Sequence, residues 1–280
     1  MHKLVAAVIA LSIAASANAQ LGDIWKKIDP TKIKKGAKVV QSASHEFTED
    51  EEADIGRVVA ARILANYSLS KNDKLQQYVT LVGNTVAAYS SRPTLEWHFA
   101  VIDAPFVNAF STPGGFIFIT SGALKEITSE AQLAAVLGHE IAHVTQKHIL
   151  KEIKRANTIS AGVDMAKESS TGSFITDELG EKIGKIAYEK LFTTGLSRRD
   201  EEESDTIGTE LAALAGYKGY EFLTFLEKLK KLEGSKEMSI LTATHPKPSD
   251  RIKYLQPRLK SDDGVVLAER WEQWTQASVR

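Results

Sequence analysis

The feature that most constrains this chain is the run HEIAH at residues 139–143, which lies inside a stretch of helical periodicity. Ser129 and Gln132 form a capping pair that predicts the start of this helix, and the periodicity continues to about Arg155. Because helical residues turn by about 100° each, side chains four positions apart differ by only about 40°. Any fold of this chain must therefore place two imidazoles side by side on one helix.

Two adjacent imidazoles next to a carboxylate suit a zinc ion. His139 and His143 can share the metal, whereas Glu140 lies about 100° round the helix and can reach a water beside the metal. Burying three ionisable groups together without a metal would cost too much, so two core histidines are the weaker interpretation. The face roughly opposite the histidines is apolar and anchors the helix: Leu133, Leu137, Ile141 and Val144.

A further histidine, His148, is not expected to join this site. Along one continuous helix it lies about 160° from the histidine pair, on the apolar stripe, which indicates a packed or capped residue. The longer pattern that supplies a third histidine also requires glycine at position 146 and histidine at position 149. This chain has Gln146 and Ile149 there, so that class of site is excluded.

The third protein ligand must then come from another segment, and the acidic run at residues 200–205 is the obvious source. Glu201 and Asp205 are four positions apart on a predicted helix, so both can face the metal. Glu201 is expected to bind the metal and Asp205 to orient a histidine ring from behind. Without the upstream motif, this run would be interpreted as a solvated helix face.

The periodicity predicts an α+β, mainly helical fold. A capping box at Thr48 and Glu51 starts a helix over about 50–67, and a second helix ends before Pro93. Residues 95–102 alternate and predict a half-buried strand, and two further extended runs flank a Pro-Gly-Gly turn, so a small antiparallel sheet is expected. Residues 156–180 are interpreted as a loop. Further helices are expected over about 181–192, 198–215, 220–233 and 249–259.

The chain divides into four expected parts. Residues 1–19 have the layout of a secretory signal peptide with cleavage after Ala19, and residues 20–49 form an N-terminal arm. Residues 50–260 form the catalytic domain, and residues 261–280 form a C-terminal helical tail. The apolar run near the start is shorter than the roughly 20 residues of a spanning helix, and no later segment could span a bilayer. The mature chain is therefore expected to be exported without a transmembrane segment.

Composition excludes several other classes. Cysteine is absent, so the sequence offers no disulfide framework, no thiolate metal ligand and no lipid-bearing cysteine. The formal net charge is −1, and nothing favours nucleic acid as a partner.

Four ordered motifs carry a family resemblance. They are the run at 139–143, Ser197-Arg198 with Glu201 and Asp205, Asn108-Ala109-Phe110 before Pro113-Gly114-Gly115, and His245-Pro246 with Arg251. Together they resemble peptidase family forty-eight of the zinc metallopeptidases, the HtpX-related family, over roughly residues 50–260. The chain is most similar to the soluble periplasmic LoiP-like and BepA-like members.

The resemblance implies a zincin-like metallopeptidase fold with an active-site helix. It implies one Zn²⁺ per chain, held by His139, His143 and Glu201, as in a gluzincin-type endopeptidase with a downstream glutamate. It also implies that Glu140 is the catalytic base and that Asp205 is the acidic residue behind a ligand.

The transition state needs another donor, and His245, Arg198 and Arg251 are the candidates. We favour His245 as a catalytic residue, because it lies in a loop context beside Pro246. The matching histidine of similar enzymes approaches the metal and restrains activity. Whether His245 ligates zinc or supports the transition state stays open at this stage, as does an ordinary surface position.

The segment Asn108, Ala109 and Phe110 resembles the edge strand on which such enzymes align their substrate as an added strand. Phe110 could equally be a core residue. The resemblance implies a polypeptide substrate, namely exported and unfolded or misfolded envelope proteins, and thus protein quality control in the periplasm. Peripheral association with a membrane or with envelope assembly machinery is compatible with it. The alternative is a latent protease that acts mainly as a client-binding or chaperone-like module.

Overall fold

The structure is a computed structural model that describes residues 46–160, 177–259 and 263–276. The predicted signal peptide, most of the N-terminal arm and the centre of the predicted loop at 156–180 lie outside the described residues. Within the described ranges, no helix is both long and apolar enough to cross a bilayer.

Two helices precede the sheet, as predicted. Helix α2 (Glu49–Leu64) begins at a capping box, since the Thr48 side chain accepts from the backbone N–H of Glu51 and the Glu51 side chain accepts from that of Thr48. Helix α3 (Asp73–Ala87) begins at Asn72, whose side chain accepts from the N–H of Leu75. Side-chain caps therefore fix where both helices begin.

The sheet has three strands, β1 (His98–Ile102), β2 (Ala109–Thr112) and β3 (Phe116–Thr120), in the order β1-β3-β2. Strand β1 is parallel to β3 and β2 is antiparallel to it, so the sheet is mixed, and the prediction of a purely antiparallel sheet is wrong. The chain passes from β1 to the far edge and then turns back through η1 (Pro113–Gly115) into the centre. Gly114 and Gly115 make this turn with φ of 72° and 89°.

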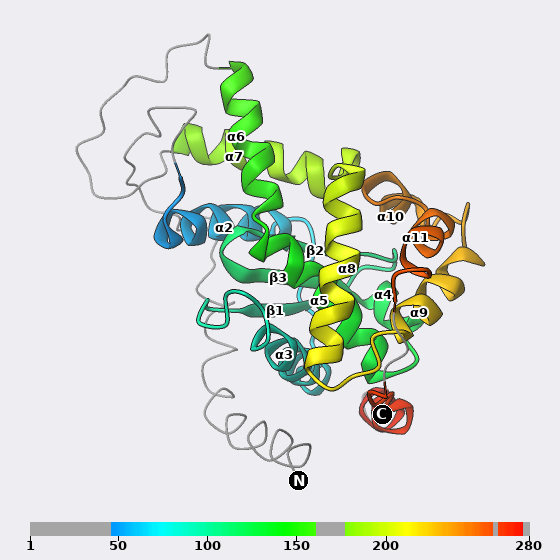
Figure 1. Cartoon of the computed structure of the whole chain (residues 1–280). Helices are drawn as coiled ribbons and strands as arrows, with labels where there is room; N and C mark the ends of the chain where they lie inside the picture. The colour runs from blue at the N-terminus through cyan, green and yellow to red at the C-terminus, as the bar shows by residue number, and fades with distance from the viewer. Residues whose placement is uncertain (1–45, 161–176, 260–262, 277–280) are drawn as a thin grey trace.

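Both faces of the sheet are buried, which corrects the expected half-buried strand at 95–102. All five residues of β1 are buried. Phe99 and Val101 point into a core shared with α3 and the next long helix, whereas Ala100 and Ile102 point into a second core shared with α2. Figure 1 shows α3 and α2 on opposite sides of the sheet. The alternation of apolar residues over 95–102 indicated that one face of the strand is buried, but it gave no sign that the other face is buried as well.

The long predicted helix through the HEIAH run is two helices. Helix α5 (Glu130–Thr145) begins at Ser129, as predicted, but ends at Thr145, and α6 (His148–Ser160) follows. Lys147 separates them with a left-handed φ of 57°. Since α6 reaches Ser160 and α7 (Asp177–Glu189) begins at Asp177, both described ends of the predicted loop at 156–180 are helical.

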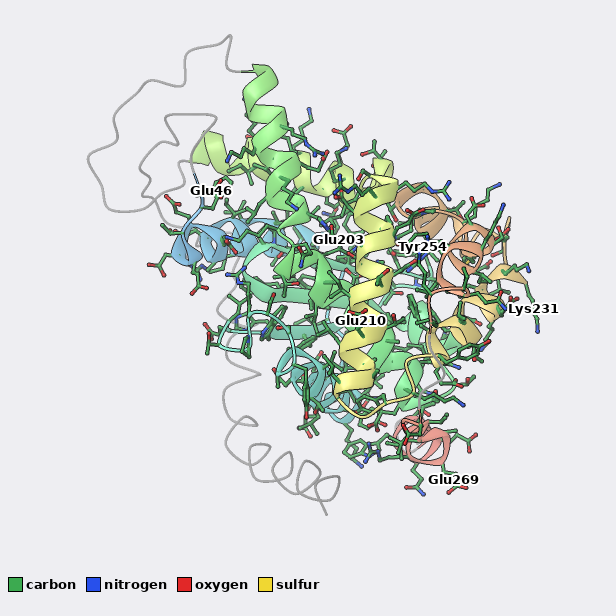
Figure 2. The ribbon with its side chains drawn as sticks, in the orientation of Figure 1. Glu46, Glu203, Glu210, Lys231, Tyr254 and Glu269 are labelled. Atoms are coloured by element: carbon green, nitrogen blue, oxygen red, sulfur yellow. The ribbon has the colours of Figure 1, made fainter. Side chains whose placement is uncertain are left out.

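The C-terminal half is helical, as predicted. Helix α8 (Arg198–Leu214) packs along α5 and carries Glu203 and Glu210 toward the viewer in Figure 2. Gly216 and Gly234 follow helices with φ of 91° and 86°, as expected of helix stops. The remaining elements are α9 (Glu221–Lys230), α11 (Pro248–Leu255) and α12 (Ala268–Gln276), with the unpredicted short elements α4 (Ser121–Glu126), η2 (Lys190–Thr194) and α10 (Ser239–Thr244).

Candidate metal centre

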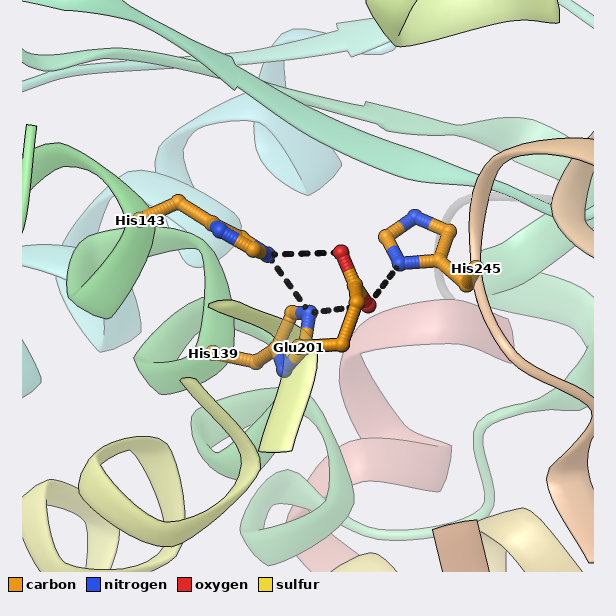
Figure 3. A group of neighbouring side chains, drawn as sticks. All are labelled: His139, His143, Glu201 and His245. Atoms are coloured by element: carbon orange, nitrogen blue, oxygen red, sulfur yellow. Dashed lines mark hydrogen bonds and ion pairs between the residues drawn. The ribbon is translucent and has the colours of Figure 1, made fainter. Parts of the chain in front are cut away.

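The two histidines of the HEIAH run lie side by side, and α8 brings a carboxylate to them. The Nε2 atoms of His139 and His143 are 3.0 Å apart. Glu201 Oε1 lies 3.5 Å from His143 Nε2, and Glu201 Oε2 lies 3.7 Å from His139 Nε2. All three side chains are buried, and Figure 3 shows them converging on one point.

This donor set fits a zinc ion. Ligand atoms about 2.0–2.1 Å from a tetrahedral zinc are about 3.4 Å from one another, close to the three separations found here. Glu201 Oε1 is buried and has no hydrogen-bond partner among the described residues. A buried carboxylate oxygen of this kind is costly unless a cation satisfies it.

Two glycines let α5 and α8 approach closely at this point. A Cβ atom added to Gly138 would lie 2.5 Å from the carbonyl oxygen of Gly208, and one added to Gly208 would lie 2.5 Å from the backbone nitrogen of His139. Real side chains do not tolerate such distances, so both positions need glycine. The close backbone contact brings Glu201 and Asp205 within reach of the histidines.

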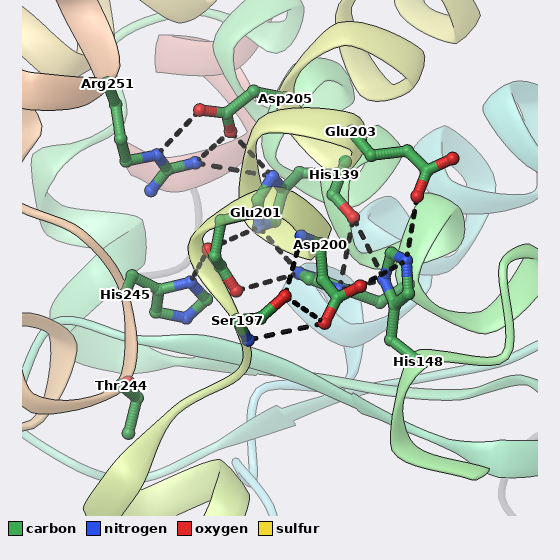
Figure 4. A network of polar contacts seen from close by, with 12 residues as sticks. His139, His148, Ser197, Asp200, Glu201, Glu203, Asp205, Thr244, His245 and Arg251 are labelled. Carbon is green, nitrogen blue, oxygen red and sulfur yellow. Dashed lines mark hydrogen bonds and ion pairs between the residues drawn. The ribbon is translucent and has the colours of Figure 1, made fainter. Parts of the chain in front are cut away.

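Asp205 lies behind His139, as predicted. Its Oδ1 is 2.8 Å from His139 Nδ1, and Arg251 donates from Nε to Asp205 Oδ2 at 3.0 Å and from Nη2 to Oδ1 (Figure 4). Burial alone would raise the pKa of Asp205, but the Arg251 guanidinium and the His139 ring together outweigh it and hold that pKa well below its usual range. Asp205 therefore stays a carboxylate that can accept the Nδ1 hydrogen of His139.

His148 contacts the site, contrary to the sequence-based exclusion. Its Nδ1 lies 2.8 Å from His143 Nδ1, and Ser204 Oγ lies 3.1 Å from the same His143 atom. The helical extrapolation was wrong because α5 ends at Thr145 and the left-handed Lys147 redirects the chain. His148 is still not placed to join His139, His143 and Glu201 around a metal, since it approaches His143 at Nδ1, the ring nitrogen that faces away from the centre.

The surroundings of His143 and His148 favour the neutral form of both imidazoles. Burial lowers the pKa of His143 well below its usual value, and the neighbouring His139 lowers it further. Burial also lowers the pKa of His148, although Asp200 and Glu203 oppose this effect. A neutral imidazole keeps the lone pair that a metal ligand needs.

Glu140 lies on the next position of the helix, inside a cavity beside the ligands. Burial raises the pKa of its carboxyl, an effect that nearby His139 and His245 partly oppose. The cavity is lined mainly by apolar side chains, including Val136, Phe222 and Leu241, and also by Asn108. Glu140 thus shares this cavity with His139 and with His245.

His245 also reaches the centre. Its Nδ1 is 2.6 Å from Glu201 Oε2, and one ligand atom from each of His139, His143, Glu201 and His245 lies within 4.8 Å of the others (Figure 3). Burial lowers the pKa of His245, but the Glu201 carboxylate outweighs this effect and leaves it raised. His245 stands where it can either complete a shell of four ligands or hold Glu201 in place.

The two candidate arginines are separated by the structure. Arg198 is on the outer side of α8, with its side chain 66% exposed and paired with Glu202 at 2.8 Å, so it is not brought to the centre. Arg251 is buried and lines the cavity, but its guanidinium is engaged by Asp205. The sequence could not show which arginine reaches the centre, because each lies in a motif that also contains residues of the site.

The predicted substrate strand adjoins the same cavity. Asn108 and Ala109 line it, whereas Phe110 packs in the second core against Phe118 and Phe192. The Asn108 side-chain amide is buried, with no hydrogen-bond partner for either polar atom among the described residues. Phe110 also lines a second cavity at the centre, together with Glu140, His143 and His245, so it is both a core residue and a wall of the site.

Sequence comparisons with known proteins identify the family of this chain. The family model described as peptidase family M48 matches residues 73–259. The chain belongs to this metallopeptidase family. The beta-barrel assembly-enhancing protease of Yersinia pestis is 28% identical over 187 residues, covering 63% of this chain and 37% of that protein.

Two eukaryotic relatives are similarly distant. The mitochondrial metalloendopeptidase OMA1 of Schizosaccharomyces pombe is 31% identical over 200 residues, covering 69% of this chain and 57% of that protein. The OMA1 protein of Arabidopsis thaliana is 32% identical over 181 residues, covering 65% and 35%. The chain thus spans between about a third and just over half of these relatives' lengths.

Proposed function

We propose that this protein is a zinc metalloendopeptidase that binds one Zn²⁺ through His139, His143 and Glu201. The observation that carries the proposal is the convergence of two imidazole nitrogens with a buried carboxylate whose Oε1 lacks a hydrogen-bond partner among the described residues. The residue next to the first histidine is a glutamate in the adjoining cavity. Membership of peptidase family M48 supports peptide-bond hydrolysis as the reaction.

The residues divide the chemistry between them. Zinc supplies Lewis-acid chemistry when bound, by polarising a peptide carbonyl and acidifying water. Glu140 takes a proton from the attacking water onto its carboxylate and then gives it to the leaving amine, as a general base followed by a general acid. Asp205 keeps the His139 ring in the tautomer that presents Nε2.

His245 is proposed as the donor near the reacting carbonyl. Its ring lies within reach of the ligand group, and its Nδ1 is bonded to Glu201 Oε2. A histidine in this place can stabilise developing negative charge on the substrate oxygen. Arg251 supports the site through Asp205 and through its Nη2, which lies 3.3 Å from His139 Nδ1, and Arg198 has no role in the proposed reaction.

Strand β2 is proposed to align the substrate. It lies at the edge of the sheet beside α5, and Asn108 O accepts from Thr120 N of β3. Because hydrogen-bonded pairs alternate along an antiparallel ladder, Ala109 and Ser111 direct their backbone groups toward the open edge. A peptide added there would be held in an extended form, largely independent of its sequence, and the Asn108 amide could bond to its backbone.

This mode of binding favours unfolded polypeptides as substrates. We propose that the protein is exported through residues 1–19 and acts in the periplasm on unfolded or misfolded envelope proteins. The similar protease of Yersinia pestis is named for beta-barrel assembly, which supports an envelope role. Recovery of the mature protein from the periplasm with Gln20 at its N-terminus would support this location, whereas an uncleaved cytoplasmic chain would contradict it.

The central test compares wild type with Glu140→Gln in zinc content and in cleavage of a permanently unfolded protein. We expect both to bind one zinc per chain and the variant to cleave about 10²- to 10⁴-fold more slowly, since it loses the acid–base group. Glu210→Gln, an exposed change on α8, is the matched control and should cleave normally. Equal cleavage by wild type and Glu140→Gln would show that the catalytic assignment is wrong.

A second candidate function is a latent protease that mainly binds client proteins. The position of His245 favours it, because this ring can close the ligand shell and so block the open position that a catalytic zinc requires. If wild type and Glu140→Gln protect an unfolded client from aggregation equally and neither cleaves it, client binding is the function. Faster cleavage by His245→Ala would identify a restraining ligand.

A further inference from the structure

His148 is a buried titratable residue that the proposed reaction leaves without a task. It is 1% exposed and lies between two groups of polar atoms (Figure 4). On one side, its Nδ1 faces His143 Nδ1 at 2.8 Å and Ser204 Oγ at 3.5 Å. On the other side, its Nε2 faces Glu203 Oε2 at 3.3 Å and Asp200 Oδ1 at 3.5 Å.

Hydrogen placement along this chain is restricted. Two ring nitrogens 2.8 Å apart can share one hydrogen, so one of the two Nδ1 atoms donates and the other accepts. If His143 gives its Nε2 lone pair to a cation, the hydrogen of that neutral ring is on Nδ1. His148 Nδ1 must then accept, which places the His148 hydrogen on Nε2, facing the two carboxylates.

The same logic weighs against a second cation site. His148, Asp200 and Glu203 each offer a ligand atom within 4.8 Å of the others. A cation there would take the Nε2 lone pair of a neutral His148 and force its hydrogen onto Nδ1, toward His143. His143 would then have to accept on Nδ1 and carry its hydrogen on Nε2, which would remove it from the first site.

We propose that His148 is a positioning residue that fixes the tautomer and the ring orientation of His143. The chain of contacts runs from Asp200 and Glu203 through His148 to His143, and it gives that ligand the support that Asp205 gives His139. This inference rests on the proposed zinc site, since it assigns His148 a role in zinc affinity. The carboxylates that accept from His148 also increase the electron density that His143 offers the metal.

Local folding explains how the sequence builds this contact. The turn at Lys147, with φ of 57°, ends α5 and starts α6 at His148. The Lys147 ammonium pairs with the buried Glu52 of α2, which ties the turn to the body of the domain. Asp200 is itself fixed, because its other oxygen accepts from Ser197 in the capping box of α8.

The test compares two substitutions at one position by competition with a zinc-binding dye. His148→Leu removes the acceptor, and we expect zinc to bind about 10- to 100-fold more weakly, as when other residues behind a metal ligand are lost. His148→Asn keeps an acceptor oxygen near the place of Nδ1 and should recover most of the affinity. Unchanged affinity in His148→Leu, or equal losses in both variants, would overturn the inference.

A control separates this role from general destabilisation. Ile153→Ala, one turn further along α6 and fully buried in the second core, should lower the thermal midpoint without changing zinc affinity. If Ile153→Ala weakens zinc as much as His148→Leu does, His148 acts only through stability. Two zinc ions in wild type and one in His148→Leu would instead reveal a second cation site and overturn the proposal.

The readout is zinc binding, so the test does not depend on proteolysis. A wild type that binds zinc but cleaves nothing would refute the proposed function while leaving the His148 comparison intact. A His148→Leu variant that binds zinc normally would refute the inference while leaving the protease assignment intact.

Discussion

At the scale of single residues, the site is built from two differently supported histidines. His139 has a charged support, in which Asp205 lies between its Nδ1 and the Arg251 guanidinium. His143 is supported by a longer chain of contacts, which runs through His148 to Asp200 and Glu203. Both arrangements leave Nε2 as the atom facing the centre, so both histidines are held in the tautomer that a cation requires.

The Asp205–Arg251 pair should couple strongly in stability. Asp205 is fully buried and Arg251 is 7% exposed, so Asp205→Asn leaves a guanidinium without its carboxylate. We expect this change to lower the free energy of unfolding of the metal-free protein by about 3–5 kcal/mol. In Asp205→Asn with Arg251→Met, the loss should be smaller than the sum of the two single losses. Urea denaturation measures all four proteins, and strict additivity would contradict the coupling.

The sequence could predict which side chains meet at the centre but not everything behind them. His139, His143, Glu201 and Asp205 follow from i, i+4 spacing, which survives inside any regular helix. His148 did not follow, because a single left-handed residue at Lys147 changes the direction of the chain and periodicity carries no sign of it. A lysine at this position gives no warning, since glycine and asparagine are the usual left-handed residues.

At the scale of elements, the contact between α5 and α8 determines the geometry of the centre. The helices carry the proposed ligands, and their backbones approach at Gly138 and Gly208 without intervening side chains. Elsewhere, helices are usually 8–10 Å apart because side chains separate them. The distance between Glu201 and the histidines thus depends on two residues that contact no metal.

Gly208→Ala should weaken zinc binding by separating these helices. The added Cβ would meet the His139 backbone nitrogen at 2.5 Å, so α8 must shift and carry Glu201 away. We expect a loss of about 1–3 kcal/mol in the free energy of unfolding, together with weaker zinc binding. Gly184→Ala in α7 is the matched control, since its Cβ would meet no atom closer than 3.5 Å. Equal zinc affinity in both variants would contradict this role for Gly208.

Long helices were predictable because caps and periodicity are local, as Thr48 with Glu51 and Ser129 with Gln132 show. Strand β3 also follows the Pro-Gly-Gly turn directly, as one of the two predicted extended runs. The sheet topology was not predictable. Strand β1 pairs with β3 although β2 lies between them in the sequence, and no local pattern indicates such pairing. Helix α10, which leads into His245, has only six residues, too few for a periodic signal.

Helix α12 joins the domain through a buried polar cluster on Glu130. Tyr78 of α3 and Tyr217 both donate to its carboxylate, and Arg270 of α12 donates to both of its oxygens. Trp271 packs beside this cluster and donates to Ile127 O at 2.9 Å. Trp271 therefore packs on the domain.

The same cluster predicts instability in alkali. Burial raises the pKa of both Tyr78 and Tyr217, whereas unfolded tyrosines ionise near pH 10. The folded state thus keeps protons that the unfolded state loses, and stability that is complete below pH 10 falls as pH rises above it. The free energy of unfolding should fall by about 1.4 kcal/mol per pH unit for each tyrosine.

Urea denaturation between pH 9 and 11 measures this slope. Tyr217→Phe removes one ionising group and should make the decline of the free energy of unfolding shallower by the contribution of one tyrosine, about 1.4 kcal/mol per pH unit. Tyr220→Phe, at an exposed position, is the matched control. A slope that is the same in Tyr217→Phe as in wild type would contradict the assignment.

At the scale of the whole molecule, the centre lies where segments from far apart in the sequence meet. The sheet separates two hydrophobic cores, one containing much of α5 and the other containing α2 and part of α6. Helices α8 and α11 then bring Glu201, Asp205 and Arg251 against α5. Both cores are built from apolar side chains, which distinguishes this protein from small domains that fold only around zinc.

Chelation should therefore lower stability without unfolding the chain. Zinc at 100 times its dissociation constant stabilises the folded state by about 2.7 kcal/mol, and each kcal/mol corresponds to about 2–4 °C in a domain of this size. We expect EDTA to lower the thermal midpoint by about 5–11 °C and to leave the far-ultraviolet circular dichroism at 25 °C unchanged. Glu140→Gln should keep this shift, whereas His143→Ala should lose it, because His143 is a proposed ligand and Glu140 is not. A shift of equal size in His143→Ala would place the bound zinc elsewhere, and loss of helical signal on chelation would show that the cores depend on the cation.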